Sequence, residues 1–177
     1  MAESDDLVYL TREPINAEVR VERIRGLITP AGQHYVRGHF PIPAAPAELT
    51  IGGAVEDQIR LTLDQIRSLP ARALAVTLEC AGNGRRFLQP PVPGEQWGLG
   101  AVGTAEWTGT PLRAVLESAR PRRDAVDVLF VGADRGMPAG TTQTIPFERS
   151  LPLADAMNDD VLLAYAMNGV PLPPEHG

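Results

Sequence analysis

Apolar residues in this chain occur in short runs that end at a glycine or a proline after a few positions. The 17 glycines and 17 prolines among 177 residues mark many turns. Residues 49–51 and 59–61 are rich in apolar side chains and are joined through Gly52 and Gly53, which predicts a β-hairpin. The pattern is therefore that of a chain built from short strands and tight connections.

Further strands are predicted from short apolar runs bounded by turn residues. The segment "ALAVTLE", residues 73–79, predicts a buried strand that delivers Cys80 to its end. Residues 126–131 and 144–147 predict two more strands, with Asp134 in the loop between them.

Helical signals are few. Thr62 is expected to cap a short helix over residues 63–68. Residues 111–119 have apolar residues at helical spacing, with Thr110 as the N-cap and Pro111 as the first helical residue.

The chain divides into two parts by pattern. Residues 1–30 predict an irregular N-terminal arm, in which residues 7–10 and 19–27 form short ordered segments. Residues 31–177 then form one domain. Many short strands, few short helices and long loops indicate an α+β fold with a mixed, β-rich sheet, not a regular series of βαβ units.

Composition narrows the class of protein. Hydrophobic and charged contents of 44% and 21% are ordinary for a globular domain. The formal net charge of -6 argues against nucleic acid or an anionic membrane as a partner. No apolar stretch approaches the ~20 residues of a membrane span, and the N-terminus has no apolar segment typical of a signal peptide, so we expect a cytoplasmic protein. All 16 basic residues are arginine, which excludes Schiff-base chemistry on lysine.

Cys80 is the only cysteine, so an internal disulfide and a cluster of cysteine ligands are excluded. In "TLECAGNGRRFL" it stands between the predicted strand and a Gly-Asn-Gly turn, and Arg85 and Arg86, which favour the thiolate form, follow. Such a thiolate is a metal ligand, or a nucleophile paired with one of the three histidines. A buried structural thiol is the alternative.

Three other segments carry candidate binding residues. Tyr35, Arg37 and His39 alternate in "HYVRGHFPIP", so an extended chain directs all three to one side. That side suits an oxyanion, although a surface turn would have the same pattern. Trp97 lies in a glycine-rich loop and is expected to line a pocket, and Asp134 would cap a turn or accept a hydrogen bond from a ligand amine.

Four blocks together carry a resemblance to a known family. The blocks "YVRGHFPIP", "TLECAGNGRR", "AEWTGTPLRAVL" and "LLAYAMNGVPLPPEHG" occur in the order and spacing of the molybdenum-pterin domain of the sulfite oxidase family. That family includes eukaryotic sulfite oxidase, plant-type nitrate reductase and bacterial sulfite dehydrogenases. The resemblance extends from about residue 30 to the end of the chain.

The resemblance implies a role for each matching residue. Cys80 would be the protein ligand of molybdenum, a role that suits a soft thiolate. The substrate pocket would be lined by Arg37, Arg85 and Trp97. The residues implied to bind the molybdopterin cofactor are Tyr35, Val36, Arg37, His39, Asp134 and His176, of which His176 would contact the phosphate region.

Two positions depart from the family pattern. Gly38 stands where the family has an asparagine before the histidine, and Gly84 stands where the first arginine follows C-A-G-N. Arg85 is therefore matched to the family's pocket arginine by its spacing from Cys80.

The implied activity is oxygen-atom transfer at molybdenum, with oxidation of sulfite to sulfate as the leading reaction. The resemblance implies a small anionic substrate and homodimeric full-length proteins. Because no haem domain is recognised in the sequence, it also implies a separate electron acceptor such as a cytochrome. One alternative is reduction of another oxyanion, such as nitrate, or of an S- or N-oxide. Others are a non-catalytic remnant and a cysteine hydrolase, which requires a histidine within reach of Cys80.

The family pattern continues past the final "HG" with further cofactor-binding residues and a dimerisation domain. We therefore expect an incomplete domain, as a fragment or a truncated product. By itself this chain is expected to bind the cofactor weakly or not at all.

Overall fold

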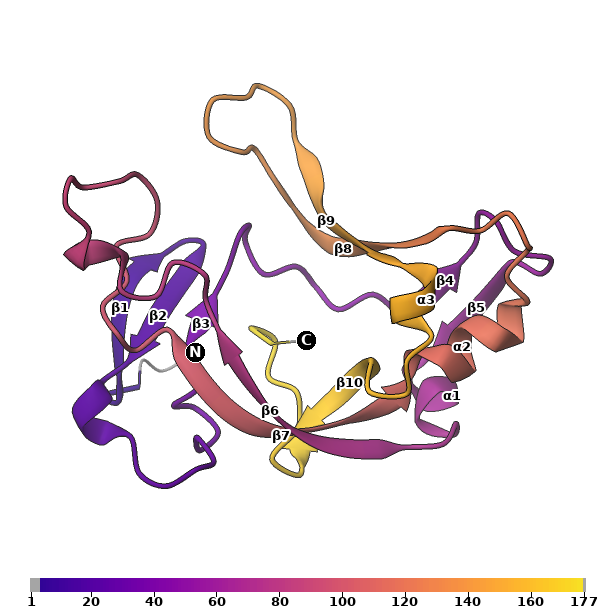
Figure 1. The fold of residues 1–177 in the computed structure, drawn as a ribbon, viewed down its shortest axis with the longest axis horizontal. Helices are drawn as coiled ribbons and strands as arrows, with labels where there is room; N and C mark the ends of the chain where they lie inside the picture. The colour runs from indigo at the N-terminus through magenta and orange to yellow at the C-terminus, as the bar shows by residue number, and fades with distance from the viewer. Residues whose placement is uncertain (1–3, 177) are drawn as a thin grey trace.

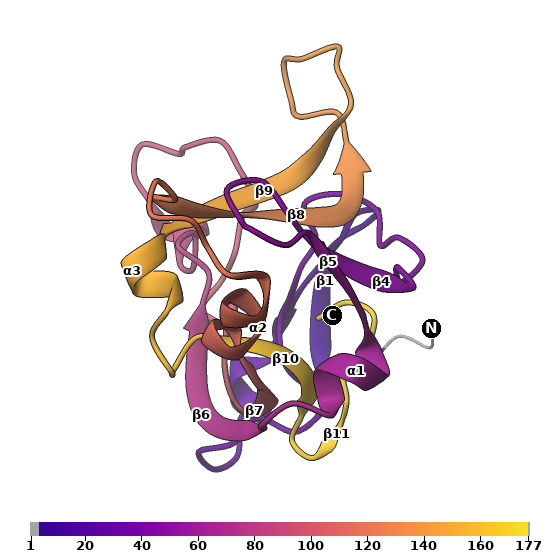
Figure 2. The ribbon, with the colours of Figure 1, turned by 90° about the vertical axis from the view of Figure 1, so that its right-hand side faces the viewer.

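The computed structural model describes residues 4–176 as several small sheets and a few short helices (Figures 1 and 2). Every ladder between the described strands is antiparallel. The predicted α+β, sheet-rich class is confirmed, and the one difference is that these ladders include no parallel pair. No helix within these residues is long and apolar enough to cross a membrane.

The first sheet lies at the left of Figure 1 and contains, in spatial order, β1 (Leu7–Arg12), β2 (Ile15–Val19) and β3 (Val36–Arg37). Its hydrophobic cluster consists of Leu7, Ala17, Val19 and Val36. The short ordered segment predicted over residues 7–10 is confirmed, whereas residues 11–18 were expected to be irregular and instead complete the β1–β2 hairpin. The hairpin is ordered because its apolar side chains pack with Val36, a contact across the chain that a local pattern does not reveal. A short 3₁₀ helix, Val21–Arg23, follows it.

A second sheet has the order β11-β10-β7-β6. Its strands are β6 (Arg72–Glu79), β7 (Val102–Pro111), β10 (Leu162–Met167) and β11 (Val170–Pro171). The ladder between β6 and β7 runs from Arg72 opposite Gly109 to Glu79 opposite Val102, so β6 ends directly before Cys80. The predicted strand is confirmed, but its predicted burial is wrong. Val76 and Leu78 are 38% and 40% exposed, so the described residues do not fully cover the faces of this strand.

The hairpin and the cap predicted around Thr62 are confirmed. The hairpin strands are β4 (Glu48–Ile51) and β5 (Ile59–Thr62), and α1 (Leu63–Arg67) follows at once. Thr62 Oγ1 accepts a hydrogen bond from Gln65 N–H at 3.2 Å, and Gln65 Oε1 accepts one from Thr62 N–H at 2.8 Å. This reciprocal capping box is purely local, which is why the sequence alone predicts it.

The second helix, α2 (Leu112–Ala119), begins one residue later than predicted, and Pro111 is its N-cap. Thr110 belongs to β7 and is fully buried, and its hydroxyl donates to the Ile66 carbonyl at 2.9 Å. The predicted cap is wrong because this tertiary hydrogen bond to the end of α1 engages the hydroxyl. A core cluster forms where α2 meets α3 (Leu153–Ala156) and contains Leu112, Leu116 and Ala156.

The long hairpin of β8 (Asp127–Gly136) and β9 (Ile145–Pro152) projects from the body in Figure 1. Both strands are longer than predicted, and Asp134 lies within β8 instead of in a loop. The ladder is irregular between Val131 and Arg135, so Asp134 sits where the strand is distorted. Such irregularities re-aim side chains next to binding sites.

Candidate functional site

Cys80 directly follows β6, and its thiol is free and half-buried. Its N–H donates to the Ala101 carbonyl at 2.9 Å, and its own carbonyl accepts from Asn83 N–H at 2.8 Å. The Asn83 side chain donates to Glu79 Oε1 at 2.9 Å and accepts from Ala101 N–H at 3.1 Å. These four bonds hold the backbone on both sides of Cys80, so a well-braced turn presents the thiol.

Tyr35 lies near enough to Cys80 to sense its charge, and its ring contacts that of Trp97. The pocket-lining role expected for Trp97 stays a prediction. Burial raises the pKa of the Tyr35 hydroxyl, and the negative charges of Cys80 and Glu79 raise it further. The Trp97 ring meets the Tyr35 ring edge-to-face with centroids 6.5 Å apart, and Trp97 is fully buried. Tyr35 therefore connects the Trp97 loop to the neighbourhood of the thiol.

Arg85 has its guanidinium folded back into its own loop. A Cβ at either Gly82 or Gly94 would lie 2.7 Å from guanidinium atoms, so only glycine leaves room for the side chain there. Arg85 Nη1 donates to the Glu95 carbonyl at 2.9 Å. The half-buried guanidinium thus braces the loop that follows Cys80, and its predicted role in the substrate pocket stays a prediction.

Arg86 pairs with a buried carboxylate. Its Nη2 lies 3.2 Å from Glu18 Oε1, and the Glu18 side chain is 6% exposed. Arg86 also donates to the Gln96 carbonyl. The sequence suggested that Arg86 would favour the thiolate of Cys80, but the structure directs its charge to Glu18 on β2 instead.

Arg37 and His39 leave β3 on the same side, as the alternation predicted. Arg37 Nη2 and His39 Nδ1 are 3.2 Å apart, and Arg37 Nη1 donates to Asn16 Oδ1 at 3.1 Å. Val36, between Tyr35 and Arg37, points the other way into the hydrophobic cluster of the first sheet. Gly38 stands where the family has an asparagine. A Cβ at this position would lie 2.8 Å from the Ile15 carbonyl oxygen, so glycine is the residue that fits here.

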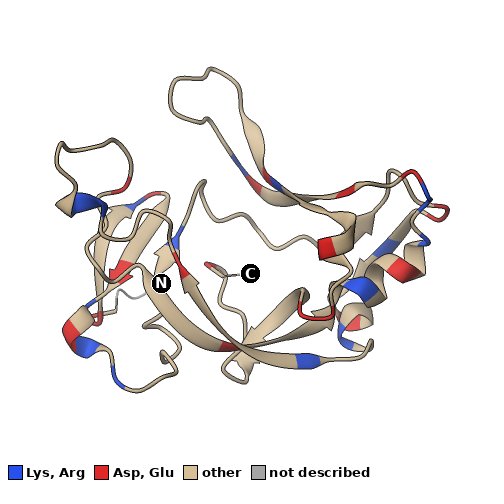
Figure 3. Ribbon diagram, in the orientation of Figure 1, with Lys and Arg blue, Asp and Glu red and all other residues tan. Residues whose placement is uncertain are grey.

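The β8–β9 hairpin brings opposite charges to His39. Burial lowers the pKa of His39, Arg37 and Arg149 lower it further, and Asp134 opposes them. The Arg149 guanidinium stacks over Phe147 at 4.4 Å, and the Phe147 ring lies 5.3 Å from the His39 ring. Figure 3 shows charged residues of both signs along this hairpin. Sequence reasoning missed Arg149, because an arginine in a strand has no local feature that separates it from a surface charge.

His176 reaches β3 from the other end of the chain. Its Nε2 lies 3.0 Å from the Tyr35 carbonyl oxygen, and His34 Nδ1 lies 3.1 Å from the same atom. The His34 ring is 5.1 Å from the His176 ring and 5.7 Å from the Trp107 ring. Within residues 4–176 no hydrogen bond joins Cys80 to a histidine, so the geometry does not support a cysteine hydrolase.

The stability of the folded protein should depend on pH because His34 is buried, with 2% of the residue exposed. Burial lowers its pKa from 6.5. The folded protein therefore binds this proton less tightly than the unfolded chain does. The free energy of unfolding should be insensitive to this group above pH 6.5 and should fall as the pH drops below 6.5, by up to about 1.4 kcal/mol per pH unit, until the folded pKa is passed.

Urea unfolding between pH 5 and pH 8 measures this slope, and His34→Asn should flatten it because asparagine does not titrate. His39 remains in both proteins and contributes equally to each. An identical slope in the variant and the wild type would show that His34 does not carry the effect.

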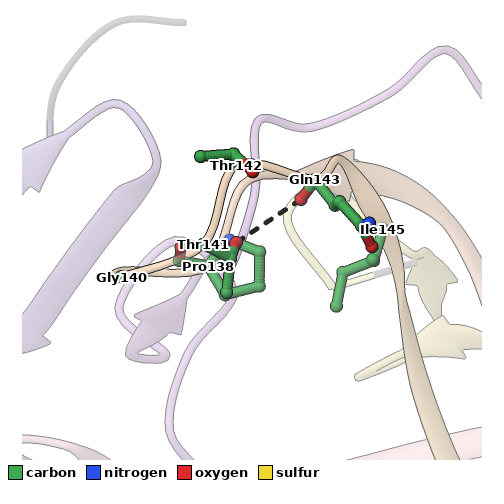
Figure 4. Close-up of a pocket in the computed structure, with 6 residues that line it drawn as sticks. All are labelled: Pro138, Gly140, Thr141, Thr142, Gln143 and Ile145. Carbon is green, nitrogen blue, oxygen red and sulfur yellow. Dashed lines mark hydrogen bonds between the residues drawn. The ribbon is translucent and has the colours of Figure 1, made fainter.

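Two surface depressions lie apart from these residues. One, of about 350 Å³, lies at the tip of the β8–β9 hairpin, where Thr141 Oγ1 donates to the Gln143 carbonyl at 3.5 Å (Figure 4). The other, of about 290 Å³, lies over β2 and is lined in part by Glu18 and Arg86. Neither is lined by Cys80 or Tyr35. The candidate site is therefore defined by the residues around Cys80 and His39 and not by these hollows.

Comparison with known proteins shows the family of the chain. Residues 39–177 match the family described as the oxidoreductase molybdopterin binding domain. The chain belongs to this family. The matched region contains Cys80, His39, Asp134 and His176, and the resemblance of the four sequence blocks is thereby confirmed at the level of the family.

Relatives come from two groups of enzymes. Nitrate reductase [NADH] 2 of Phaseolus vulgaris is 36% identical over 189 residues, which cover 100% of this chain and 21% of that protein. The mitochondrial sulfite oxidase of Rattus norvegicus is 37% identical over 178 residues, which cover 94% of this chain and 32% of that protein. The chain therefore spans about a fifth to a third of the length of these relatives.

A solved structure has the same fold. The sulfane dehydrogenase SoxCD from Paracoccus pantotrophus superposes with a TM-score of 0.76 at 27% identity, over 97% of this chain and 44% of that chain. The predicted fold family is confirmed by this superposition.

The residues present fit the molybdenum cofactor. Cys80 offers a soft, half-buried thiol. Trp97, whose ring contacts Tyr35, has a buried Nε1 donor without a hydrogen-bond partner in the protein. Two further buried nitrogens, His176 Nδ1 and His34 Nε2, also have no hydrogen-bond partner in the protein. They belong to the two histidine rings that contact each other next to the Tyr35 carbonyl. Among residues 4–176 no group of three or more His, Cys, Asp or Glu side chains could hold a metal ion.

Proposed function

We propose that this chain forms part of a molybdenum enzyme that transfers an oxygen atom, and that Cys80 is the protein ligand of the metal. The observation that carries the proposal is the half-buried, free thiol of Cys80 on a braced turn, in a chain of the molybdopterin-binding family. A single thiolate suffices as the protein ligand when the cofactor supplies the other ligands.

The chain's own residues have separable tasks in this proposal. Cys80 would hold the metal, and Tyr35 and Trp97 would cover it on the side where their rings meet. The guanidinium groups of Arg37 and Arg149, together with the uncharged imidazole of His39, would bind anionic parts of the cofactor or substrate. When bound, the cofactor would supply the two-electron chemistry of oxygen-atom transfer.

Sulfite is the proposed substrate. The relatives include a sulfite oxidase and a sulfane dehydrogenase, both named for sulfur compounds. Sulfite and water would yield sulfate, two protons and two electrons, and the electrons would pass to a separate acceptor such as a cytochrome. Arginine donors near the developing sulfate would balance its charge.

Nitrate reduction is the second candidate, because plant nitrate reductases match with nearly the same identity as sulfite oxidase. In that case nitrate would accept two electrons and two protons and yield nitrite and water. The same arginines would bind the planar anion.

The test uses the complete gene product that contains these residues, produced in a host that makes the cofactor. We expect bound molybdenum, together with sulfite-dependent reduction of cytochrome c or ferricyanide. Nitrate-dependent oxidation of a reduced viologen, without sulfite oxidation, would instead establish the second candidate. Absence of molybdenum from the folded protein would contradict both and would favour a non-catalytic remnant.

A further inference from the structure

One backbone oxygen next to the candidate site accepts hydrogen bonds from two histidines. The Tyr35 carbonyl oxygen lies 3.1 Å from His34 Nδ1 and 3.0 Å from His176 Nε2. A carbonyl oxygen has two lone pairs and can only accept, so each of these ring nitrogens must carry a proton. The bonds therefore select opposite tautomers, Nδ1–H for His34 and Nε2–H for His176.

Packing prevents the His34 ring from leaving this position. The ring is 2% exposed and stacks on the Tyr35 ring with centroids 5.1 Å apart. The His176 ring meets it edge-on at 5.1 Å. A Cβ at position 103 would lie 2.7 Å from His34 Cδ2, so Gly103 on β7 is the wall behind it.

The carbonyl that the histidines hold is the last peptide group before β3. On one side Tyr35 extends toward Trp97 and Cys80, and on the other side Val36 and Arg37 pair with β2. The bond from His176 joins residues 141 positions apart, and in Figure 1 the segment after β11 returns to the middle of the molecule. Movement of this carbonyl would therefore displace both Tyr35 and Arg37.

We propose that His34 and His176 are paired positioning residues that hold the Tyr35 carbonyl and thereby fix Tyr35 against Cys80. Neither histidine acts on the thiol directly. The consequence for cofactor binding rests on the function proposed above, whereas the effect on Cys80 in the cofactor-free protein does not.

The tautomers make the proposal specific, because amide side chains imitate one ring nitrogen each. The side-chain nitrogen of asparagine corresponds in position to histidine Nδ1, and that of glutamine corresponds to Nε2. His34→Asn and His176→Gln should therefore retain the bond to the Tyr35 carbonyl. The swapped pair, His34→Gln and His176→Asn, should lose it.

The first measurement is of ring-nitrogen chemical shifts in the ¹⁵N-labelled wild-type protein at pH 8, with the three histidines assigned from single variants. We expect His34 as the Nδ1–H tautomer, which is the less common one in free histidine, and His176 as the Nε2–H tautomer. The proposal is wrong if His34 carries its proton on Nε2. This measurement needs no destabilising substitution.

The second measurement is the rate at which a thiol reagent, dithionitrobenzoate, modifies Cys80, the only cysteine in the chain. Loss of one hydrogen bond, worth roughly a fivefold change in an equilibrium, should raise this rate about fivefold in the swapped pair. His34→Asn and His176→Gln should stay within about twofold of wild type. A general loss of packing would raise the modification rate equally for the asparagine and the glutamine variant at the same position. Equal rates for His34→Asn and His34→Gln would therefore overturn the proposal.

The complete gene product then separates this proposal from the proposed function. If both hold, His34→Gln should contain less molybdenum than His34→Asn. If the thiol rates follow the predicted pattern while the wild type binds no molybdenum, the positioning pair stands and the proposed function fails.

Discussion

Replacing Cys80 with serine is expected to remove most of the bound molybdenum from the complete gene product. A serine hydroxyl stays protonated near neutral pH and is a hard oxygen donor, whereas the cysteine thiolate is the soft ligand that the metal prefers. We expect molybdenum per polypeptide, measured by inductively coupled plasma mass spectrometry, to fall more than about 10-fold, since even changes behind a metal ligand cost that much.

The matched control is Ala81→Ser, which places the same hydroxyl one residue further along, at an exposed position. It should retain wild-type molybdenum. Circular dichroism should show both variants folded, because the four backbone and Asn83 bonds that brace the turn do not use the thiol. Retention of molybdenum by Cys80→Ser would show that the thiol is not the metal ligand.

Replacing Gly100 with alanine is expected to produce the largest loss of stability from a single methyl group. A Cβ at this position would lie 1.9 Å from the Val19 carbonyl oxygen, a backbone atom that cannot turn aside. Gly100 also accepts a hydrogen bond from Val19 N–H at 3.0 Å and donates one to Glu18 Oε2 at 3.2 Å. The clash would break both bonds and should lower the free energy of unfolding by about 3 kcal/mol or more.

Gly52→Ala is the control for this substitution, because its Cβ would meet only Gln58 at 3.5 Å, an ordinary contact. Its effect should stay below about 1 kcal/mol. Urea unfolding monitored by tryptophan fluorescence measures both. Since Gly100 docks the Trp97 loop onto β2, Gly100→Ala should also expose Trp97 and shift its emission to longer wavelength. If the unfolding free energy of Gly100→Ala stayed within about 1 kcal/mol of wild type, the close approach of Gly100 to the Val19 carbonyl would be contradicted.

Several features were predictable because their causes lie within a few residues of each other. The capping box joins Thr62 to Gln65, three positions away, and the connection that begins at Gly52-Gly53, residues 52–58, lies between the two strands that it joins. Cys80 at the end of β6 followed from an apolar run that stops at a Gly-Asn-Gly turn. The family was predictable for a different reason, because four blocks in the correct order are specific even though each is short.

Other predictions were wrong where a distant partner decided the outcome. Thr110 binds the Ile66 carbonyl instead of capping α2, and Arg86 pairs with Glu18 instead of lying beside the thiol. Asp134 lies within β8 because pairing with β9 extends the strand past the predicted turn. In each case the local pattern was compatible with two outcomes, and a tertiary contact selected one.

The sequence by itself therefore determined the short-strand architecture, the turn that directly follows Cys80, and membership of the molybdopterin-binding family. Tertiary structure alone decided that residues 7–19 form a hairpin on β3, that Arg149 faces His39, and that His34 and His176 meet at the Tyr35 carbonyl. The physical reason is the range of the interactions. Capping, turn and strand propensities act between near neighbours, whereas the contacts that assemble the site join residues as far apart as Tyr35 and His176, which only the folded chain brings together.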